Sequence, residues 1–585
     1  MRLASLSALS LTLLSLGCSS QPQPEAEASR PPNIVLVMTD DQGYGDLGVH
    51  GNTMIHTPNI DKLHDESIRL TDFHVDPTCS PTRSALMSGR YSSRTGVWHT
   101  IMGRSIVAAD EVLLPKILGD AGYATGQFGK WHLGDNYPFR PEDKGFQRVV
   151  RLGGGGVQQT PDYWGNDYFD DTYWTDSVPK PYQGYCTDVF FNEALAFIEQ
   201  NKDKPFFVYL PTNAPHGPYL VDEKYSQPYV DKGVPQQMAQ FYGMIENIDE
   251  NVGRLSAKLD ELGLRENTIL IFMTDNGSAA GVSPDGSPIT GAEWGGFNAG
   301  MKGRKGSQYD GGHRVPFFLR WPAGDFGPPR DIDTLAAHVD VLPTLAELGG
   351  AAIPAGLDLD GRSLAPLLRG KDWSERTLVV HSQRIDIPRK WKTSAVMTER
   401  WRLIDGEELY DIEADPGETR DVSGDFPQEV QSLRAAYEAW WDHIDERFDD
   451  RVHIPIGSDG ENPTRITAHD WLADDDEQVP WNQPAIRKDP AVNGVWYVEV
   501  PVAGTYELEL YQHDKPDNKT LDATQAWAQV GEQEASAAVA PGAVSAKLTL
   551  ELPAGRTTMR TKLSGKGAER GAFFVYVKRV GAAGD

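Results

Sequence analysis

The sequence predicts an α/β protein with a large, mostly parallel central sheet flanked by helices, a smaller antiparallel C-terminal subdomain and an added C-terminal β-sandwich-like module. Three observations predict it. Apolar runs of strand length at 34–38, 206–210 and 269–273 lack polar alternation, which is typical of strands buried on both faces. Helical periods lie between them, and strands that alternate with helices favour a parallel sheet. Near the end of the chain, apolar and polar residues alternate in several short runs, as in antiparallel strands.

The elements follow in chain order. Helical periods are expected at 57–70, 111–123, 187–200 and 236–263, short antiparallel strands at 401–423, and a closing helix at 428–448. Alternating runs that begin at Gly494, Gly504, Lys547 and Gly571 predict the strands of the β-module. We therefore expect six segments: a signal peptide at 1–17, a flexible tether at 18–31, the main α/β domain at 32–375, the antiparallel subdomain at 376–446, a linker at 447–489 and the β-sandwich-like module at 490–585.

The first twenty residues have the features of an export signal. Arg2 precedes an apolar stretch, 3–16, that is too short to span a bilayer. The "LSLGC" at 14–18, at the end of this stretch, is typical of bacterial lipoproteins, in which Cys18 would be lipidated; simple secretion with loss of Cys18 is the alternative. We expect an exported chain, periplasmic or at the cell surface as a lipoprotein and secreted otherwise, with a membrane contact only through the lipid.

Composition limits the class of partner. The net charge is -29, and no run of Lys and Arg interrupts it, which argues against nucleic acid or an anionic membrane surface. Of three cysteines, Cys79 and Cys186 lie in the body of the chain, too few for a disulfide framework. Cys186 begins a helical period and is expected to be a small buried residue.

Two of the apolar strands end in the same polar pattern. Thr39, Asp40 and Asp41 follow the first, and Thr274, Asp275 and Asn276 follow the third. In parallel sheets, ligands bind beyond the carboxyl ends of the strands. Four oxygen ligands without nitrogen or sulfur, Asp40, Asp41, Asp275 and Asn276, indicate Ca²⁺ or Mg²⁺ rather than zinc. A single Asp after a strand is more often a turn or cap residue, but the repeated pattern favours a metal site.

Basic and proton-carrying side chains are expected around that point. They are Arg83, Lys130, His132, His216 and Lys305. Lys130 and His132 alternate, so in an extended segment both would face the same way. A cation, basic side chains and two histidines together form a pocket for an anion, with an acid and a base available.

Cys79 stands before a predicted helix, in "DPTCSPTRSALMSGRY". A thiolate nucleophile activated by nearby cations is one interpretation. The phosphate loop of tyrosine phosphatases, however, needs Cys and Arg six positions apart. Here position 85 is Ala and Arg83 comes too early, so a simple thiolate mechanism fits poorly.

With these residues assembled, the chain from about 31 to 445 resembles the formylglycine-dependent (type I) sulfatases of the alkaline phosphatase superfamily. "CSPTRSALMSGRY" is similar to the first signature of the family and "GYATGQFGKWHLG" to the second. "DDQGYGD", "PHGPY", "TDNG" and "KGSQYDGGHRVP" occur in the order of the family. Asp310 stands where Glu is commonest, a departure that need not touch the site.

The resemblance implies an alkaline-phosphatase-like fold and a sulfuric ester hydrolase in which Cys79 is oxidised to formylglycine (3-oxoalanine) before folding, by a formylglycine-generating enzyme that reads Pro81 and Arg83. One oxygen of the aldehyde hydrate, held on Ca²⁺ (or Mg²⁺) by the four oxygen ligands, would attack sulfur. By similarity, Lys130, Lys305 and Arg83 would offset the developing charge. His216 would protonate the leaving alcohol, and His132 would act as the base that releases the sulfate.

Three functions remain open from the sequence: a sulfatase, a phosphonate or phosphate ester hydrolase of the same superfamily, and a non-catalytic glycan-binding protein. Export, a β-module and abundant Trp and Tyr favour a sulfated carbohydrate, although an aryl sulfate would fit the same chemistry. By family position, rim residues for the sugar are expected among Arg94, His99, Arg104, His381 and Arg384, with Lys390 and Lys392 beside them.

Overall fold

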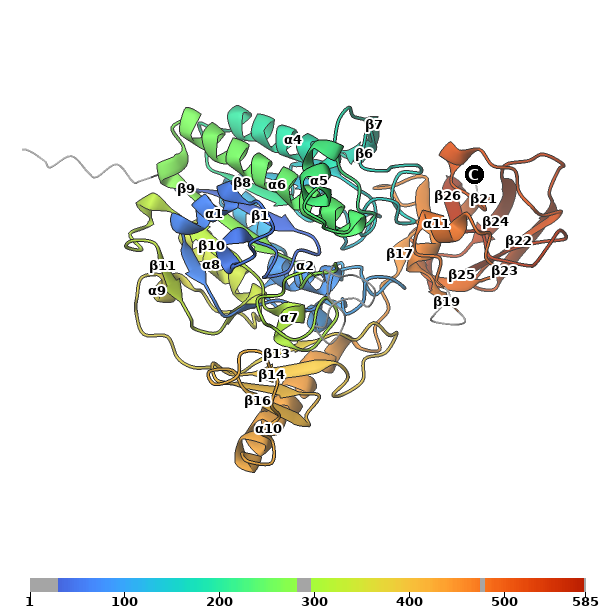
Figure 1. The fold of residues 1–585 in the computed structure, drawn as a ribbon. Helices are drawn as coiled ribbons and strands as arrows, with labels where there is room; N and C mark the ends of the chain where they lie inside the picture. Colours follow the sequence, from blue (N-terminus) through green and yellow to red (C-terminus); the bar gives the residue numbers. More distant parts are fainter. Residues whose placement is uncertain (1–29, 281–295, 474–478, 583–585) are drawn as a thin grey trace, which may run out of the picture.

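The structure, a computed structural model, describes residues 30–280, 296–473 and 479–582 (Figure 1). The predicted signal peptide, most of the tether and Cys18 lie outside the described residues. Within the described residues, every helix is too short or too polar to cross a membrane.

A ten-stranded sheet forms the centre of the molecule. Its order is β11-β2-β10-β9-β1-β8-β4-β5-β6-β7, and the four central neighbours β9, β1, β8 and β4 run parallel. The three apolar runs of the sequence are therefore adjacent strands, which confirms the predicted α/β fold class. The strands are β1 (Asn33–Thr39), β2 (Ile68–Leu70), β4 (Ala124–Gly129), β5 (Arg148–Arg151), β6 (Thr172–Thr175), β7 (Val178–Pro181), β8 (Phe206–Pro211), β9 (Thr268–Thr274), β10 (Phe317–Arg320) and β11 (Arg330–Ile332).

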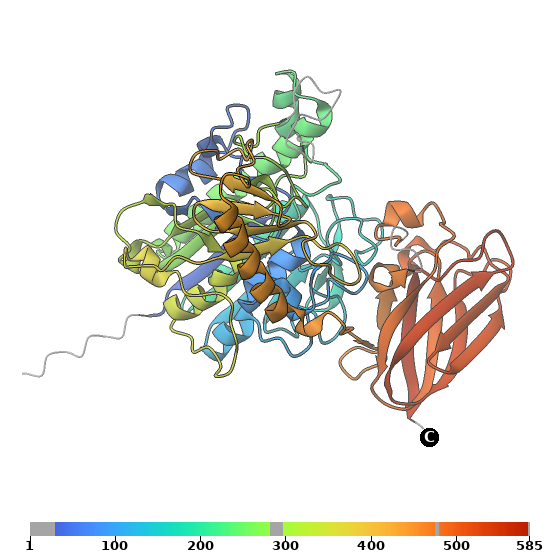
Figure 2. The same cartoon turned by 90° about the horizontal axis from the view of Figure 1, so that it is seen from below.

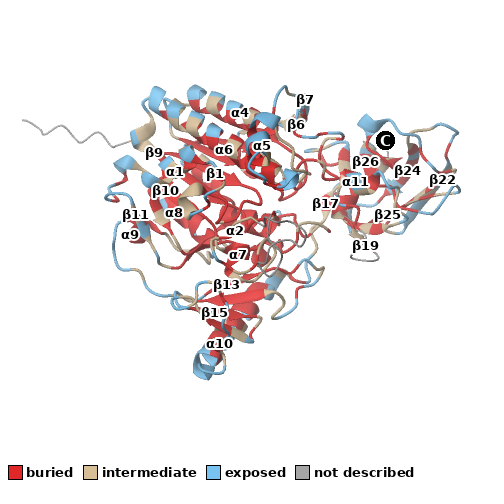
Figure 3. Ribbon diagram, viewed as in Figure 1, coloured by how far each residue is buried: buried red, intermediate tan, exposed pale blue. Residues whose placement is uncertain are grey.

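Helices cover both faces of this sheet (Figure 1). The side chains of β1 alternate between two cores: Ile34 and Leu36 pack in one, Val35 and Val37 in the other. Figure 3 shows buried residues concentrated along the sheet. The first core is covered by α2 (Cys79–Ser88), α3 (Leu114–Asp120), α8 (Val341–Leu348) and α9 (Ala365–Leu368), the second by α1 (Pro58–Asp65), α4 (Cys186–Gln200) and α6 (Gln236–Glu261).

The predicted helices are present, with one difference. The period expected over 57–70 ends at Asp65, and Ile68–Leu70 instead forms β2 beside β10. The apolar residues of this segment are therefore divided between a helix, α1, and the strand that follows it, β2. Cys186 opens α4 as a buried free thiol, as expected. Three shorter elements belong to the same domain: β3 (Phe73–His74) pairs β12 (Ala336–Ala337), and α5 (Glu223–Val230) packs on α6.

The antiparallel subdomain consists of the expected short strands and a closing helix. Its sheet, β13 (Leu378–His381), β14 (Ser394–Met397), β15 (Trp401–Ile404) and β16 (Glu408–Asp411), is a meander of antiparallel neighbours. The closing helix α10 (Pro427–Ile444) lies across it, as Figure 2 shows. Tyr437, Trp440 and Trp441 of α10 share a core with Val396 and Leu403 of the sheet.

The C-terminal module is a sandwich of two sheets, and it begins earlier than the sequence predicts. Segment 447–489, expected as a linker, supplies β17 and β19 beside β20, and β18 beside β26. The sheets are β17 (Ile454–Pro455), β20 (Gly494–Val500), β25 (Gly555–Ser564), β22 (Gln525–Val530) and β23 (Gln533–Ala538), with β19 (Leu472–Ala473), against β18 (Thr464–Thr467), β26 (Phe574–Ala582), β21 (Gly504–Tyr511) and β24 (Ala546–Leu552).

The module shares its apolar core with the main domain. Met102, Ile106, Phe139 and Trp164 of the main domain belong to the same buried cluster as the inner side chains of the sandwich. The Trp164 ring lies 5.9 Å from the Phe574 ring. Burying four such side chains excludes water from the junction, so the module is a fixed part of the molecule.

Candidate active site

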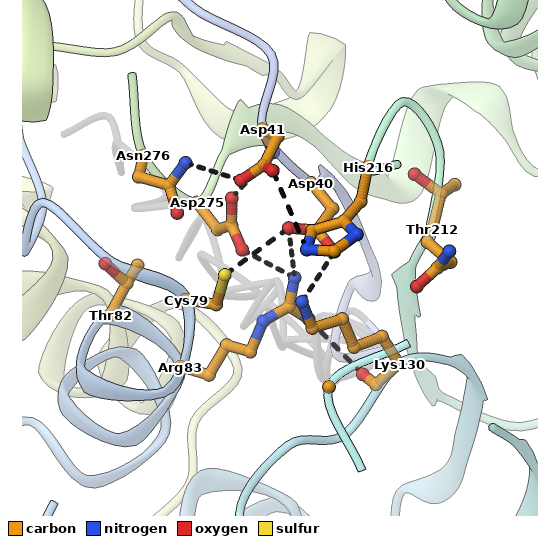
Figure 4. Close-up of polar contacts among 12 residues, drawn as sticks. Asp40, Asp41, Cys79, Thr82, Arg83, Lys130, Thr212, His216, Asp275 and Asn276 are labelled. Atoms are coloured by element: carbon orange, nitrogen blue, oxygen red, sulfur yellow. Dashed lines mark hydrogen bonds and ion pairs between the residues drawn. The ribbon is translucent and has the colours of Figure 1, made fainter. Parts of the chain in front are cut away.

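The predicted site residues meet at the carboxyl ends of the four parallel strands (Figure 4). Asp40 and Asp41 follow β1, and Asp275 and Asn276 follow β9, its direct neighbour. On the other side of β1, His216 follows β8, and Lys130 and His132 follow β4. Cys79 is the first residue of α2, Arg83 lies one turn later, and Lys305 lies in the loop before α7 (Asp310–His313). The strand order therefore explains why distant segments converge.

The four oxygen ligands expected from the sequence form one buried group. The backbone N–H of Asp41 donates to Oδ1 of Asp275 at 3.1 Å, and Nδ2 of Asn276 donates to Oδ1 of Asp41 at 3.0 Å. Asp41 has a positive φ of 68°, a conformation that turns the chain sharply where β1 ends. The turn directs two successive carboxyl groups into the same site.

Cys79 lies against this group. Its Sγ is 3.6 Å from Oδ1 of Asp40 and 3.4 Å from Nζ of Lys305. Burial raises the pKa of the Cys79 thiol to about 12, despite the opposing charges of Lys130 and Lys305. A thiol with that pKa is protonated at neutral pH, and the protonated form is a weak nucleophile. The geometry therefore argues against direct attack by the thiolate.

Three cations balance the carboxylates: Lys130 and Arg83 are buried, and Lys305 is partly buried. Nζ of Lys130 donates to Oδ2 of Asp40 at 2.6 Å, Nη2 of Arg83 donates to Oδ2 of Asp275 at 2.7 Å, and Nζ of Lys305 donates to Asp41. Burial alone would raise the pKa of Asp41, but the neighbouring cations, Lys305 first and then Lys130, hold it well below its usual range. Burial and the neighbouring charge of Asp40 raise the pKa of Asp275 to about 6.

Two histidines flank the cluster. His216 Nε2 is 3.7 Å from Oδ2 of Asp41, while its Nδ1 is 2.7 Å from the carbonyl of Gly217, so Nδ1 carries the proton in the neutral ring. His132 Nε2 lies 3.0 Å from the carbonyl of Thr100, which leaves Nδ1 as an acceptor with no partner among the described residues. Burial lowers the pKa of His216 to about 4 and that of His132 well below its usual range. Both rings are therefore neutral near pH 7.

The segment after β4 differs from the extended one expected. The strand ends at Gly129, and His132 has a positive φ of 61°. Lys130 and His132 nevertheless both reach the site, Lys130 through its ion pair with Asp40 and His132 at the wall of the cavity. Both side chains therefore reach the same site, as expected, but a turn after β4 brings them there instead of an extended segment.

A cavity of about 300 Å³ opens over Cys79. It is lined by Cys79, His99, Thr100, Ile101, His132, Gln159, His216, Lys305, Arg384 and Trp481. Thr100, Ile101, Gln159 and Trp481 were not expected from the sequence. Of these, only Trp481 could have been suspected from the sequence, because it lies between Pro480 and Asn482 in a stretch that contains several Pro and Trp residues.

Of the expected rim residues, His99 and Arg384 line the cavity, and three others do not. Arg94 is held in ion pairs with Asp358, Asp360 and Glu446. Arg104 donates to Asp386 and lies over the ring of Trp98, and buried His381 is hydrogen-bonded to Ser93 and Gln383. These three side chains are engaged in contacts with the subdomain and its surroundings and do not line this cavity.

The remaining cations of that loop also differ. Exposed Lys390 pairs with Glu438 and Asp442 on α10, away from the cavity lining. No ion pair of Lys392 or Arg384 is seen among the described residues. Arg384, which is exposed within the cavity, therefore offers a guanidinium to an anionic ligand.

The residues present fit a hard divalent cation. Asp40, Cys79 and Asp275 bring one potential ligand atom each within 4.8 Å of one another. Oδ1 of Asn276 is buried and has no hydrogen-bond donor among the described residues, although buried polar atoms normally have a partner. An oxygen ligand set with one unpaired oxygen suits Ca²⁺ or Mg²⁺.

A second buried cluster, His74, Asp310 and His313, does not suit a cation. Arg402 donates to Oδ1 of Asp310 at 3.0 Å and to Oδ1 of Asp72 at 2.7 Å. Its guanidinium already neutralises both carboxylates. Asp310, the residue that departs from the commonest family motif, is thus held by Arg402 and takes no part in the site around Cys79.

Comparisons with known proteins agree with this geometry. The model of the sulfatase family matches residues 32–351, and that of the C-terminal part of N-sulphoglucosamine sulphohydrolase matches 303–439. Human arylsulfatase A is 29% identical over 470 residues, covering 69% of this chain and 87% of its own. N-acetylgalactosamine-6-sulfatase of Canis lupus familiaris is 30% identical over 394 residues, covering 63% and 71%.

Among solved structures, Ps i-CgsB in complex with k-i-k-neocarrahexaose is similar with a TM-score of 0.61 and 27% identity, covering 71% of this chain and 93% of that one. The family match spans β1, β4, β8, β9, α2 and the loop of Lys305, and so includes Cys79 with the carboxylates, cations and histidines around it, but not Arg384 or Trp481 of the cavity lining. The chain belongs to the sulfatase family: it is a type I sulfatase of the alkaline phosphatase superfamily, an enzyme of sulfate ester hydrolysis.

Proposed function

We propose that this enzyme removes sulfate from a sulfated carbohydrate, using formylglycine made from Cys79 and a divalent cation, Ca²⁺ in preference to Mg²⁺. The observation that carries the proposal is the position of Cys79. Its side chain meets Asp40 and Lys305 at the floor of a cavity that also presents two neutral histidines. This is the arrangement required for a nucleophile next to an anionic ester.

Residue 79 must be converted before it can act. The unmodified thiol is protonated at neutral pH, because burial raises its pKa to about 12. A hydrated formylglycine supplies one oxygen that attacks sulfur and a second hydroxyl whose deprotonation expels sulfate and restores the aldehyde. Cys79 is only 2% exposed in the folded chain, so the formylglycine-generating enzyme has to act before folding is complete.

The cation would be held by Asp40, Asp41, Asp275 and Asn276. When bound, a divalent cation stabilises negative charge on the attacking and sulfate oxygens. Arg83 fixes the orientation of Asp275 through its 2.7 Å hydrogen bond. Lys130 and Lys305 contact Asp40 and Asp41 and add positive charge around residue 79.

The two histidines divide the proton transfers. His216 Nε2 faces the carboxylate cluster and lines the cavity, where an incoming sulfate anion raises its basicity; it protonates the leaving alcohol. His132 is held by Thr100 through Nε2, so Nδ1 is the free lone pair that accepts the proton during sulfate release. The two rings therefore act as acid and base in turn.

The cavity and the relatives support a sulfated carbohydrate as the substrate. Ps i-CgsB is solved with a neocarrahexaose, and another relative is an N-acetylgalactosamine-6-sulfatase. Arg384 and Trp481 line the cavity, and a cation with an exposed indole suits an anionic sugar better than a bare aryl sulfate. The lipoprotein pattern at Cys18 supports export to the periplasm or cell surface, where such carbohydrates are met.

Two measurements test the proposal. Mass spectrometry of the peptide that contains Cys79, from protein made in its native host, should show loss of the thiol in favour of the aldehyde. Turnover should be compared on sulfated galactan and glycosaminoglycan oligosaccharides, an aryl sulfate, and the matching phosphate and phosphonate esters. Unmodified Cys79 in active protein would contradict the formylglycine mechanism, and faster turnover of phosphate or phosphonate would overturn the sulfate specificity.

A further inference from the structure

Trp481 is an exposed indole in the wall of the active-site cavity. It is 42% exposed and is the only exposed tryptophan among the described residues. It lines the cavity together with Cys79, yet it belongs to the segment between β19 and β20, within the C-terminal module. The module therefore reaches into the catalytic site.

The backbone on both sides of Trp481 is fixed to the main domain. Oγ1 of Thr160 donates to the carbonyl of Pro480 at 2.6 Å, and the N–H of Thr160 donates to the carbonyl of Trp481 at 3.0 Å. The N–H of Gln483 donates to the carbonyl of Gln158 at 2.8 Å. Because three hydrogen bonds hold the backbone of this short stretch, the chain that carries the indole is positioned before any ligand arrives, and binding need not order this backbone.

The next residues anchor the stretch more deeply. Gln483 begins α11 (Gln483–Ile486) and is fully buried. Its Oε1 accepts from the N–H of Gly165 at 3.0 Å, and its Nε2 donates to the carbonyl of Tyr163 at 3.3 Å. The same loop of the main domain sends Trp164 into the core of the module. Two interlocking contacts thus hold the module, and Trp481 with it, against the catalytic domain.

The exposed part of the Trp481 indole is apolar surface that a ligand in the cavity could cover favourably. Indole faces stack on the apolar C–H faces of sugar rings, and one aromatic ring can stack on different sugars. In the proposed function the cavity over Cys79 would receive the sulfate group, so a ring against Trp481 would be the sugar that carries it or a neighbouring sugar.

We propose that Trp481 is a stacking platform for a sugar ring next to the reacting sulfate, so that the C-terminal module supplies a carbohydrate subsite of the active site. The inference rests on the proposed function, and it adds the residue that selects oligosaccharide over small esters. Stacking is present in both the bound ground state and the transition state. Its loss therefore raises KM for the oligosaccharide more than it lowers kcat.

Kinetics of the full-length protein test the platform. Trp481→Ala should lower the ratio of kcat/KM on the best oligosaccharide to kcat/KM on 4-nitrophenyl sulfate by about fivefold to tenfold, the loss expected for one aromatic contact. Trp481→Phe, which keeps a ring, should recover most of that ratio. Trp527→Ala is the matched control, because Trp527 is a half-buried tryptophan of the module on β22, outside the cavity lining. Its ratio should stay at the wild-type value.

A binding measurement separates this inference from the proposed function. Calorimetry should compare Cys79→Ala with Cys79→Ala/Trp481→Ala, using neocarrahexaose and a chondroitin-6-sulfate hexasaccharide as probes. We expect the double variant to bind about fivefold to tenfold more weakly. Equal affinity, or no binding by either protein, would overturn the platform even if the enzyme is an active sulfatase. Binding that depends on Trp481 in a protein that desulfates nothing would instead overturn the proposed function and leave the platform standing.

Discussion

Nζ of Lys130 lies 2.6 Å from Oδ2 of Asp40, and neither side chain is exposed to solvent. An ion pair buried on both sides depends on each partner, because removal of one leaves the other charge without compensation. Arg83, whose Nη2 is 4.0 Å from the other oxygen of Asp40, is too far away to replace the lost hydrogen bond.

Lys130→Met should therefore impair both folding and catalysis. We expect a loss of about 3 kcal/mol in the free energy of unfolding and a fall in kcat of about a hundredfold or more, measured by urea titration and by sulfatase assay. Lys116→Ala is the control, since Lys116 forms an exposed pair with Asp120 and should change neither quantity noticeably. A Lys130→Met protein with wild-type stability would contradict the assigned burial of the pair.

Cys79→Ala should abolish sulfate ester hydrolysis, with a loss on the order of 10³-fold or more, while the fold survives. The reason is that residue 79 is the proposed nucleophile and contributes only a small side chain to packing. Cys186→Ala is the matched control: this buried thiol lies in α4, away from the site, so its loss should cost about 1 kcal/mol of stability and leave kcat unchanged. Comparable activity loss in both variants would point to general misfolding.

Calcium should stabilise the enzyme through the carboxylate cluster. A ligand at a hundred times its Kd raises the free energy of unfolding by about 2.7 kcal/mol, which a thermal shift with and without a chelator detects. Asn276→Ala should reduce this shift, because Oδ1 of Asn276 is the buried oxygen left unpaired for a cation. Asn247→Ala removes a buried Asn hydrogen-bonded to Asp188 on α4 and should keep the full calcium response. An undiminished shift in Asn276→Ala would remove Asn276 from the ligand set.

Glu461 should make stability fall as the pH rises. Its carboxyl accepts from the N–H of Tyr137 at 3.0 Å and from Asn136, at the junction with the module, and burial raises its pKa from 4.5 to about 7. The folded chain therefore holds this proton more tightly than the unfolded chain. The stabilising contribution is complete below pH 4.5, declines between pH 4.5 and 7, and is absent above pH 7.

Glu461→Gln mimics the protonated state and should flatten that part of the pH profile, leaving the variant about 1–2 kcal/mol more stable than wild type at pH 8. Thermal unfolding at pH 5 and pH 8 measures the difference. Glu507→Gln, a change at an exposed position of β21, should leave the slope unaltered. An identical slope in Glu461→Gln would show that the proton is bound elsewhere.

Arg384→Ala should weaken binding of anionic substrates. The side chain lines the cavity and has no ion-pair partner among the described residues, so its charge is available to a sulfate or carboxylate. We expect KM to rise about tenfold with a smaller change in kcat. Lys390→Ala removes a charge from the same loop, but Lys390 is paired with Glu438 outside the cavity lining, so KM should not change.

Much of the fold was predictable because the signals are long and local. Uninterrupted apolar runs identified β1, β8 and β9, and the polar residues that follow them placed the carboxylate cluster correctly. The linker prediction failed at 447–489 because β17 and β19 are two residues long, too short for alternation to be seen. Their pairing is determined by partners that come later in the chain.

The rim of the site was less predictable, for a different physical reason. Whether an arginine is free or paired depends on acids that are distant in sequence. Arg94 forms ion pairs with Asp358 and Asp360, and the sequence around Arg94 does not indicate that these distant acids will pair with it. Trp481 was missed because its neighbours in the sequence resemble a spacer, and it is brought to the cavity by hydrogen bonds to residues about 320 positions earlier, such as Thr160.

The core shared by the two parts of the molecule affects the order in which the chain can mature. Met102, Ile106, Phe139 and Trp164 emerge during synthesis well before the strands that cover them, which begin at Ile454. Until those strands are synthesised, the nascent catalytic region exposes these apolar side chains to water. Its cavity also lacks Trp481. A truncation before Ile454 should therefore aggregate instead of yielding a smaller enzyme, and under the proposed mechanism the delay would leave time for Cys79 to be modified.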